Sequence, residues 1–383
     1  MIGVAIIGTG DIAGYHIEAY LARADRCTIR AVVDILPEKA RNKADRYGLG
    51  CDAVADYRDL LSRDDIQLVS ICLPPSLHSE VTVDFLLAGK HVLCEKPMAP
   101  TLDECDRMIA AERKGGAILS VVAQNRFKTD VMKTKNLLET GALGGLLYAQ
   151  ANSLWWRGSN YYDLWWRGTW EKEGGGCTFI HAVHHIDLLL WLMGDALEVR
   201  SVVSNRNHGN SEVEDLSLTT VKFSSGAMGT LVSSLLHHGE EQRFIIDGVH
   251  ASVEIPHAIA ASRQLANGYP EADDEKRREL EQLYELQPAP TFLAHDGQIE
   301  DMIGSIENDR PPLVGSADGR RTIEFISAVY QSAFSGVPVT LPMTDKDAFY
   351  TKSGILSYAI RFHKKTTSVQ GLADSGISVG GTL

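Results

Sequence analysis

Gly3-Val4-Ala5-Ile6-Ile7-Gly8-Thr9-Gly10-Asp11-Ile12-Ala13-Gly14 decides the fold of the first part of the chain. The stretch is typical of a short buried strand, a glycine-rich turn and the start of a helix, and a second apolar strand then ends just before Asp34. Gly8 permits a tight turn, Gly10 lets a pyrophosphate approach the backbone, and Gly14 lets helix and strand pack closely. Phosphates in such a turn lie at a helix N-terminus, where unpaired N–H groups and the helix dipole favour negative charge. The pattern therefore predicts a dinucleotide-binding unit.

The acid at the end of the second strand indicates which dinucleotide. Asp34 follows Gly14 by about 20 residues, the spacing at which a carboxylate accepts hydrogen bonds from the adenosine ribose. A carboxylate there repels a 2′-phosphate, so NAD is expected rather than NADP. The glycine pattern alone is a weak signal, but here the strand, the helix and the acid all occur in the required order. An ordinary turn between strand and helix is therefore the less favoured interpretation.

Composition narrows the class of protein. A chain of 383 residues exceeds what one hydrophobic core usually supports, so two domains are expected. The net charge of -13 argues against nucleic acid or an anionic membrane as a partner. The 6 cysteines are scattered without a CxxC pair, so neither a disulfide framework nor a zinc knuckle is indicated. The first strand begins at Met1 and leaves no room for a signal peptide, so the cytoplasm is the expected location.

Apolar strands alternate with helices up to about residue 123. Strands are predicted at 66–72, 91–94 and 118–122, and such a series forms a parallel sheet covered on both faces. Ligands bind beyond the carboxyl ends of such strands. Residues 1–123 are therefore predicted to form a dinucleotide-binding domain, and its ligand edge to carry Gly8 to Gly14, Asp34, Leu73-Pro74-Pro75 and Glu95-Lys96-Pro97.

The pattern changes in residues 124–365, which are predicted to form a substrate-binding and oligomerisation domain. Successive strands with hairpin turns predict a mainly antiparallel sheet. The predicted strands are 146–154, 197–205, 216–223, 227–234 and 243–247, and the predicted helices are 272–286, 298–307 and 319–335. Residues 366–383 are predicted to form a flexible tail, because residues 370–383 are rich in Gly and Ser.

Lys96 is the first candidate for chemistry. It follows a buried strand between Glu95 and Pro97, on the edge where the dinucleotide is expected. Partial burial lowers the pKa of a lysine and suits it to handling a proton or holding a reacting hydroxyl. A single lysine at a strand end is more often an ordinary surface residue. Its place beside the dinucleotide fingerprint favours the functional interpretation.

A second candidate is the segment 174–187, in which a flexible triglycine precedes a predicted helix with three histidines. His181 lies three residues before His184 and four before His185, so pairs of them are expected to share a helix face. An imidazole that titrates near neutral pH is a natural general base for a hydroxyl proton. Two alternatives stay open: core histidines that only satisfy backbone groups, and a metal site, for which no third ligand with matching spacing is found.

Five of the 6 tryptophans lie between residues 155 and 170, together with Arg157, Tyr161, Tyr162 and Arg167. Aromatic faces beside arginine side chains suit hydroxyl-rich rings such as sugars, or the amide of the cofactor. An aromatic packing cluster or a subunit contact is nearly as well supported for any one of these residues.

Together these residues resemble the Gfo/Idh/MocA family, which includes glucose–fructose oxidoreductase and inositol dehydrogenase. The resemblance covers nearly the whole chain. It is carried by the motifs Gly8–Gly14, Leu73–His78, Cys94–Pro97, Gln124–Phe127, Trp166–Trp170, residues 174–187 and Asp318–Arg321. It implies an α/β fold with an N-terminal Rossmann domain and a C-terminal α/β domain with an open, largely antiparallel sheet. It also implies NAD(P)-dependent oxidation or reduction of a sugar, cyclitol or glycoside, by a homodimer or homotetramer joined through the free face of that sheet.

The resemblance also assigns roles by position. Lys96 matches the family lysine that bonds the substrate and the nicotinamide ribose, and His184 matches the histidine that takes or gives the hydroxyl proton. Fingerprint and resemblance together predict a cofactor site of Gly8, Gly10, Asp11, Ile12, Asp34, Leu73, Pro74, Pro75, His78, Glu95, Lys96, Gln124, Asn125, Trp166 and Arg167. They predict a substrate site of Lys96, Arg126, Tyr161, Trp165, His181 and His184, and no metal.

One departure from the family concerns substrate placement. Many members have an aspartate four residues before the histidine, where this chain has Ile180, which can neither orient a hydroxyl nor assist proton transfer. His181 is a candidate to take over part of that role. Two rival functions use the same residues: a glycosidase with tightly bound NAD and no net redox change, and a sugar- or nucleotide-binding protein without catalysis.

Overall fold

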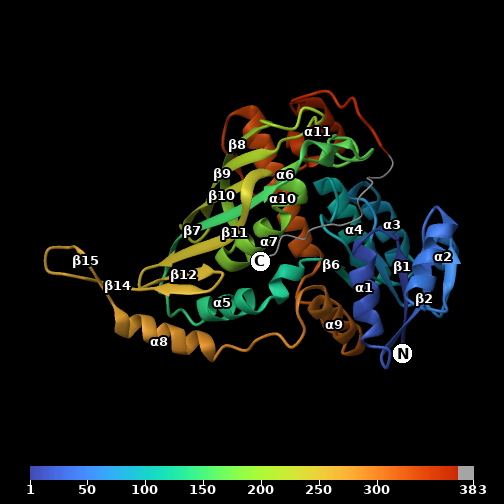
Figure 1. Cartoon of the computed structure of the whole chain (residues 1–383), viewed down its shortest axis with the longest axis horizontal. Helices are drawn as coiled ribbons and strands as arrows, with labels where there is room; N and C mark the ends of the chain where they lie inside the picture. The colour runs from blue at the N-terminus through green and yellow to red at the C-terminus, as the bar shows by residue number, and fades with distance from the viewer. Residues whose placement is uncertain (370–383) are drawn as a thin grey trace. The chain divides into compact units, whose positions relative to one another are not determined.

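A parallel sheet of six strands forms the centre of the first of two units into which the chain folds, as the computed structural model of residues 1–369 shows (Figure 1). Unit 1 consists of Met1–Gln124 and Phe292–Ile323, and unit 2 of Asn125–Thr291 and the chain from Glu324. The sequence analysis assigned residues 292–323 to the second domain, whereas in the structure they fold with the first.

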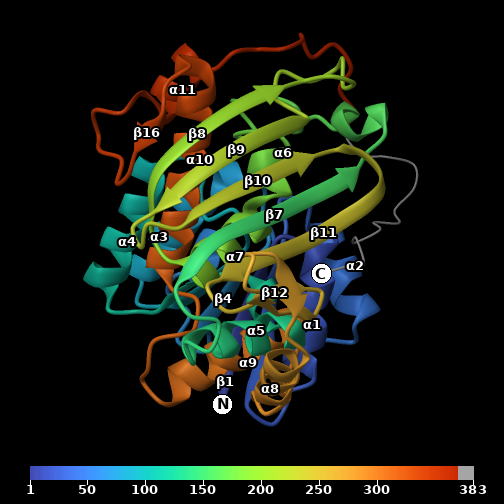
Figure 2. The same ribbon diagram turned by 90° about the vertical axis from the view of Figure 1, so that its left-hand side faces the viewer.

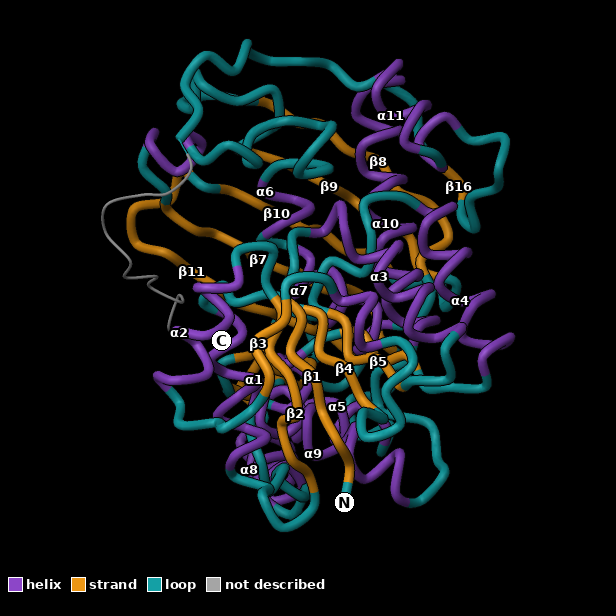
Figure 3. The backbone as a smooth tube through the Cα atoms, turned by 90° about the vertical axis from the view of Figure 1, so that its right-hand side faces the viewer, coloured by secondary structure: helices purple, strands orange, loops and turns teal. Residues whose placement is uncertain are grey.

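The sheet of unit 1 has the order β3-β2-β1-β4-β5-β6, and several of its strands lie side by side in Figure 3. This is the order of the doubly wound dinucleotide-binding fold, in which ligands bind where the strand order reverses, here beyond β1. All six residues of β1 are buried because helices cover both faces of the sheet. The strands are β1 (Ile2–Ile7), β2 (Cys27–Val33), β3 (Asp52–Val54), β4 (Leu68–Ile71), β5 (His91–Cys94) and β6 (Leu119–Val121).

Some helices of unit 1 begin with a proline. α3 begins at Pro75, because Pro74 is extended and a proline is well suited to the first helical position. His78 therefore lies in the first turn of a helix. The helices are α1 (Ile12–Leu21), α2 (Pro37–Arg46), α3 (Pro75–Leu87), α4 (Leu102–Gly115), α9 (Ala294–Glu307) and the first part of α10 (Ser316–Ser335).

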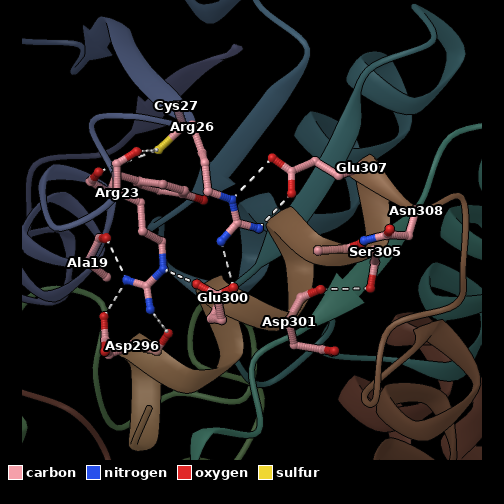
Figure 4. A network of polar contacts seen from close by, with 12 residues as sticks. Ala19, Arg23, Arg26, Cys27, Asp296, Glu300, Asp301, Ser305, Glu307 and Asn308 are labelled. Carbon is pink, nitrogen blue, oxygen red and sulfur yellow. Dashed lines mark hydrogen bonds and ion pairs between the residues drawn. The ribbon is translucent and has the colours of Figure 1, made fainter. Parts of the chain in front are cut away.

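Ion pairs attach α9 to the end of α1 (Figure 4). Arg23 is only 4% exposed, and its guanidinium donates to Asp296 Oδ1 at 2.5 Å and to Glu300 Oε2 at 2.6 Å. Arg26 binds the other oxygen of Glu300 at 2.6 Å and donates to both oxygens of Glu307. This network explains why a helix that lies late in the sequence folds with the first unit.

Unit 2 contains an eight-stranded sheet of order β13-β12-β11-β7-β10-β9-β8-β16. Among its described strands β7 and β10 run parallel and the other neighbours run antiparallel, so the sheet is mixed and mostly antiparallel. Buried and exposed residues alternate along β9, because helices pack behind one face of the sheet and leave the other open (Figure 2). The strands are β7 (Leu146–Trp156), β8 (Ala196–Ser204), β9 (Leu216–Phe223), β10 (Met228–Ser234), β11 (Leu236–Gly248), β12 (Ser252–Ile255), β13 (Ala258–Ala260) and β16 (Val339–Thr340).

The remaining elements include a separate hairpin, β14 (Ser262–Gln264) with β15 (Pro270–Ala272). The other α-helices are α5 (Thr129–Glu139), α6 (Cys177–Ile180), α7 (Val183–Met193), α8 (Asp274–Glu285) and α11 (Lys352–Tyr358). Short 3-10 segments are η1 (Tyr57–Leu60), η2 (Gln124–Phe127), η3 (Ser159–Asp163) and η4 (Ala348–Tyr350). Among residues 1–369, no helix is long and apolar enough to cross a membrane.

The predicted tail, 366–383, is only partly described. Thr366 and Thr367 donate backbone hydrogen bonds to Asn210 Oδ1, and the Val369 N–H donates to Asp163 O at 2.8 Å. Residues 366–369 are thus attached to unit 2, and the remainder of the predicted tail lies outside the described residues.

Replacing Arg23 tests the attachment of α9. Arg23→Ala should lower the free energy of unfolding by about 1–3 kcal/mol, since Asp296 loses this ion pair and Glu300 keeps only the one with Arg26. Arg310→Ala, the control, removes a 45% exposed side chain paired with Asp301 on the same helix and should cost no more than about 0.5 kcal/mol. Urea unfolding followed by circular dichroism measures both, and equal losses would contradict the special role of Arg23.

Candidate active site

The glycine turn after β1 leaves its backbone open. Gly8 has φ +100°, and a Cβ there would lie 2.5 Å from the carbonyl oxygen of Cys72 at the end of β4. At Gly10 no heavy atom lies within 4 Å of the position a Cβ would take. α1 begins two residues later, so unpaired N–H groups adjoin this open backbone. A pyrophosphate fits such a turn.

Gly14 has a different task from the predicted one. A Cβ at Gly14 would lie 2.7 Å from the hydroxyl of Tyr47, so the missing side chain makes room for this residue after α2. Close packing of the helix on a strand is not what this glycine provides. The helix α2 also contributes Lys43, whose ammonium donates to Gly10 O at 3.2 Å.

Asp34 is fixed beside the glycine turn. Its Oδ2 accepts from the Thr9 hydroxyl at 2.5 Å and its Oδ1 accepts from the Leu36 N–H at 3.0 Å. The carboxylate therefore sits at the carboxyl end of β2, next to the strand that carries the turn. A ribose hydroxyl is the group that an acid in this position accepts from, so the residues present fit NAD.

His78 joins two segments on the same edge. The ring is fully buried, with Nδ1 at 2.8 Å from Pro97 O and Nε2 at 2.8 Å from Leu73 O. Burial lowers the pKa of His78. Both ring nitrogens of His78 thus lie within hydrogen-bond distance of protein carbonyls, and the residue connects the segment after β4 with the turn after β5. Its predicted contact with the cofactor stays a prediction.

Lys96 lies half-buried in that turn, directly after a buried acid. The Lys96 N–H donates to Glu95 Oε2 at 3.1 Å, and Glu95 Oε1 lies 2.9 Å from His16 Nε2. Burial raises the pKa of Glu95, but hydrogen bonding to His16 and His295 outweighs burial and holds this pKa well below its ordinary value. Glu95 is therefore an ionised carboxylate in the interior of unit 1.

Arg126, which was predicted for the substrate site, is buried and paired with an acid, and its role in substrate binding stays a prediction. Its side chain is 1% exposed, and its Nε and Nη2 donate to the two oxygens of Asp187 at 2.8 and 2.6 Å. The guanidinium also lies 5.1 Å from the ring centroid of Trp191. A side chain this deeply buried and doubly bonded serves to fix α7 to η2. Its neighbours Gln124 and Asn125, predicted for the cofactor, are half-buried and buried on η2.

The spacing predicted that pairs of these three histidines share one helix face. In the structure, however, His181 does not lie on the same helix as His184 and His185. α6 ends at Ile180 and α7 begins at Val183, so His181 lies at the break. His185 is a core residue: it stacks on Phe244 at 5.7 Å, and no hydrogen-bond partner is found for either ring nitrogen among the described residues. Burial, with a smaller effect of a nearby lysine, lowers the pKa of His185 to about 3. His184 is half-buried on α7.

His181 faces an aromatic cluster of unit 2. Its ring centroid lies 5.9 Å from that of Trp155 and 5.6 Å from that of Tyr161. Arg167 lies between the rings of Tyr161 and Trp166, with its guanidinium carbon 4.1 Å from each centroid. It also donates to the Tyr161 hydroxyl and to Glu173 Oε1, the latter at 3.0 Å. These flat faces with ordered donors can hold a polar ring.

Trp165 is exposed and lies against a lysine. Its side chain is 38% exposed, and Lys172 Nζ lies 5.1 Å from its ring centroid. Trp165 thus stays a predicted substrate residue without a polar contact of its side chain to the aromatic cluster among the described residues.

The triglycine is tightly packed and not flexible. The Gly176 N–H donates to Glu214 Oε2 at 3.1 Å, and a Cβ on Gly176 would lie 1.9 Å from Glu214 O. Tyr330 donates to Glu214 Oε1 at 2.9 Å, and a Cβ on Gly175 would lie 2.3 Å from the Tyr330 oxygen. The glycines are needed because a buried acid and a tyrosine approach the backbone here.

The doubly wound sheet, the open glycine turn and the fixed acid define an NAD-binding oxidoreductase. The chain belongs to the Gfo/Idh/MocA oxidoreductase family: the family model described as "Oxidoreductase family, NAD-binding Rossmann fold" matches residues 2–123. The model described as "Oxidoreductase family, C-terminal alpha/beta domain" matches residues 135–341. Both confirm the family and the fold class expected from the sequence.

Characterised relatives show what this chain is similar to. Levoglucosan dehydrogenase of Pseudarthrobacter phenanthrenivorans is 27% identical over 304 residues, 71% of this chain and 78% of the relative. The 2,7-anhydro-N-acetylneuraminate hydratase of Mediterraneibacter gnavus is 27% identical over 260 residues, 66% of this chain and 67% of the relative. The crystal structure of the WlbA dehydrogenase from Chromobacterium violaceum, in complex with NADH and UDP-GlcNAcA, is 29% identical. The match covers 90% of this chain and 96% of the WlbA chain, with a TM-score of 0.78.

Several residues of these sites were not predicted. His16 offers a signal in retrospect, because it lies two residues after the last fingerprint glycine and interrupts the buried face of an otherwise apolar helix. His295, Glu173 and Glu214 offer none, since each depends on partners that the sequence pattern does not connect with them.

Asp34 is expected to set the choice of cofactor. Asp34→Ala removes a charged acceptor for the ribose and the repulsion of a 2′-phosphate, so the ratio of the NADPH to the NADH dissociation constant should fall about tenfold or more. Fluorescence titration measures both constants. Asp45→Ala, which removes an exposed acid on α2, should leave the ratio as it is. A ratio unchanged by Asp34→Ala would contradict this assignment.

Glu173 predicts a pH dependence of stability. Burial raises its pKa from 4.5 to about 7, against partial compensation by Arg167 and the Gly168 N–H. The folded state then binds the extra proton between these values, so the contribution of this group to stability falls as the pH rises from about 4.5 to 7. Glu173→Gln should reduce the change in the free energy of unfolding over this pH range by roughly 2–3 kcal/mol relative to the wild type.

Urea unfolding at several pH values measures the effect. Glu171→Gln replaces an exposed acid two residues away and is the control. If the Glu173→Gln and wild-type curves run parallel, Glu173 does not titrate as its burial requires.

Proposed function

We propose that this protein is an NAD-dependent dehydrogenase or reductase that acts on a secondary hydroxyl of a sugar, cyclitol or glycoside. The observation that carries the proposal is Lys96. It follows β5, on the same carboxyl-end edge of the parallel sheet as the glycine turn and Asp34. A half-buried lysine on the edge where NAD fits is suited to bind a hydroxyl oxygen during oxidation.

Two residues are proposed to handle the proton. NAD, when bound, accepts or returns the hydride. Oxidation of a carbinol also releases the hydroxyl proton, which needs a base that titrates near neutral pH. His184, half-buried on α7, is proposed as this base, and Lys96 as the donor that stabilises the oxygen as the proton leaves.

The substrate class is supported by unit 2. Tyr161 and Trp166 offer ring faces to the guanidinium of Arg167, and Trp155 offers one to the guanidinium of Arg157. Apolar faces with oriented donors suit sugar rings, which combine C–H faces with hydroxyl edges. Two of the relatives above, a levoglucosan dehydrogenase and a WlbA dehydrogenase in complex with UDP-GlcNAcA, support the same class.

We further propose that the protein works as a homodimer or homotetramer. The open face of the unit 2 sheet carries large exposed apolar side chains, which are Val202, Leu218 and Met228. An apolar sheet face of this kind is stabilised by burial against another copy.

The proposed roles predict a loss of turnover in two single variants. The wild type with NAD should give an absorbance increase at 340 nm with at least one member of a panel of cyclitols, aldoses and glycosides. Lys96→Ala and His184→Ala should each lower kcat by about 10²–10⁴-fold. Lys114→Ala removes an exposed lysine of α4 and should leave kcat as it is. Turnover unaffected by Lys96→Ala would refute the proposal.

A second function is favoured by one relative, the 2,7-anhydro-N-acetylneuraminate hydratase. In this alternative the protein would be a glycosidase that exchanges the aglycone for water, and tightly held NAD would supply transient redox chemistry without net change. NAD retained after purification, with release of a chromogenic aglycone without added NAD, would favour it. Binding of a sugar without turnover in either direction would instead indicate a binding protein.

A further inference from the structure

Three side chains from distant parts of the chain meet inside unit 1. His16 lies on α1, Glu95 follows β5, and His295 lies near the start of α9. Glu95 Oε1 is 2.9 Å from His16 Nε2 and 3.5 Å from His295 Nε2. His16 and Glu95 are buried, and His295 stacks on Tyr15 with ring centroids 5.5 Å apart.

The hydrogen bonds fix where the protons lie. An ionised carboxylate only accepts, so His16 Nε2 carries the hydrogen that it donates to Glu95. Burial lowers the pKa of His16, so the ring is neutral and its Nδ1 accepts from the Ser70 hydroxyl at 3.2 Å. The Ser70 oxygen in turn accepts from Tyr20, 2.7 Å away. Donation therefore runs from Tyr20 through Ser70 and His16 to Glu95.

The network ends at the lysine turn. The second oxygen of Glu95 accepts from the Lys96 N–H at 3.1 Å, so the position of this carboxylate sets the position of the Lys96 backbone. His295 is held in turn, because the next residue, Asp296, binds Arg23 through its side chain and its carbonyl. The chain of contacts thus connects α9 to Lys96.

A metal ion is the other chemistry that two histidines and a glutamate can serve. Their ligand atoms lie within 4.8 Å of one another. Ligands of a tetrahedral zinc ion with bonds of about 2.0 Å are roughly 3.3 Å apart. The 2.9 Å between His16 and Glu95 is shorter than this and is the length of a direct hydrogen bond. The geometry therefore favours hydrogen bonding.

We propose that His295 and His16 are positioning residues that hold Glu95, and through it the backbone of Lys96, so that α9 determines where the lysine lies. The catalytic consequence rests on the proposed function, whereas the effect on the backbone does not. Supporting residues of this kind are known to change rates when they are removed, because a misplacement near 1 Å can cost up to about 10²-fold.

The activity arm of the test compares two substitutions of His295. His295→Leu keeps the bulk and removes the contact, so kcat should fall about tenfold while KM for NAD and the NADH dissociation constant change less than about twofold. His295→Gln retains an N–H donor and should recover most of kcat. If the leucine variant does not fold, His295→Asn, whose amide is too short to reach Glu95, replaces it.

The matched control is His257→Leu. His257 also pairs with a glutamate, Glu281 at 2.8 Å, and stacks on a tyrosine, Tyr284 at 3.7 Å, but belongs to unit 2. It should leave kcat unchanged.

The second arm needs no substrate. Hydrogen exchange of a peptide spanning residues 91–98 reports the Lys96 N–H, and it should be faster in His295→Leu than in the wild type and restored in His295→Gln. If the wild type turns over no sugar, the proposed function fails and this arm alone decides the inference. Unchanged exchange overturns it, and so does a glutamine variant as impaired as the leucine variant. Stoichiometric zinc in the purified protein, lost in His295→Leu, overturns it in favour of a metal centre.

Discussion

Buried carboxylates organise the segments that carry the candidate chemistry. A carboxylate removed from water must be met by donors, or folding loses several kcal/mol, on the order of the 3–5 kcal/mol that a broken buried ion pair costs. Glu95 holds the Lys96 turn, Asp187 holds α7 to Arg126, and Glu214 holds the triglycine to Tyr330. Each of these acids contacts elements far apart in the sequence. Contacts with buried acids therefore fix the positions of the segments that carry the candidate residues.

Local patterns were enough to predict most of the architecture. The strands at 91–94 and 216–223 have the predicted bounds, because period, turn residues and apolar runs are local signals. Lys96 was predicted as a site residue because it follows such a strand beside a fingerprint. The attachment of α9 was not predicted, since an amphipathic helix shows that one face is buried but not what covers it. The contact between His16 and His295 likewise joins residues that no local pattern relates.

Two differences between prediction and structure, both in residues 174–187, share a physical cause. The triglycine was predicted to be flexible because glycine usually indicates flexibility, and the histidine segment was predicted to be one helix because its spacing is helical. Packing decides otherwise: Glu214 occupies the space beside Gly176 and accepts from the first turn of α6. α6 then ends after one turn, and His181, which lies in the break between α6 and α7, faces Trp155. Ile180 and His184 consequently do not lie one turn apart on a continuous helix. The role of the aspartate that many family members have at the position of Ile180 is therefore not taken over at that same position.

The partners of the buried acids also distinguish an acid that serves packing from an acid that can affect the chemistry. Asp187 meets the guanidinium of Arg126, so the pair carries no net charge and serves packing. Glu95 accepts from the neutral imidazole of His16 and from a backbone N–H, and these two hydrogen bonds hold a negative charge at the start of the Lys96 turn without neutralising it. Retained charge in a low-dielectric interior acts strongly on nearby groups. An acid held in this way can influence a reaction at the edge of the sheet, which a neutralised pair such as Arg126 with Asp187 cannot do.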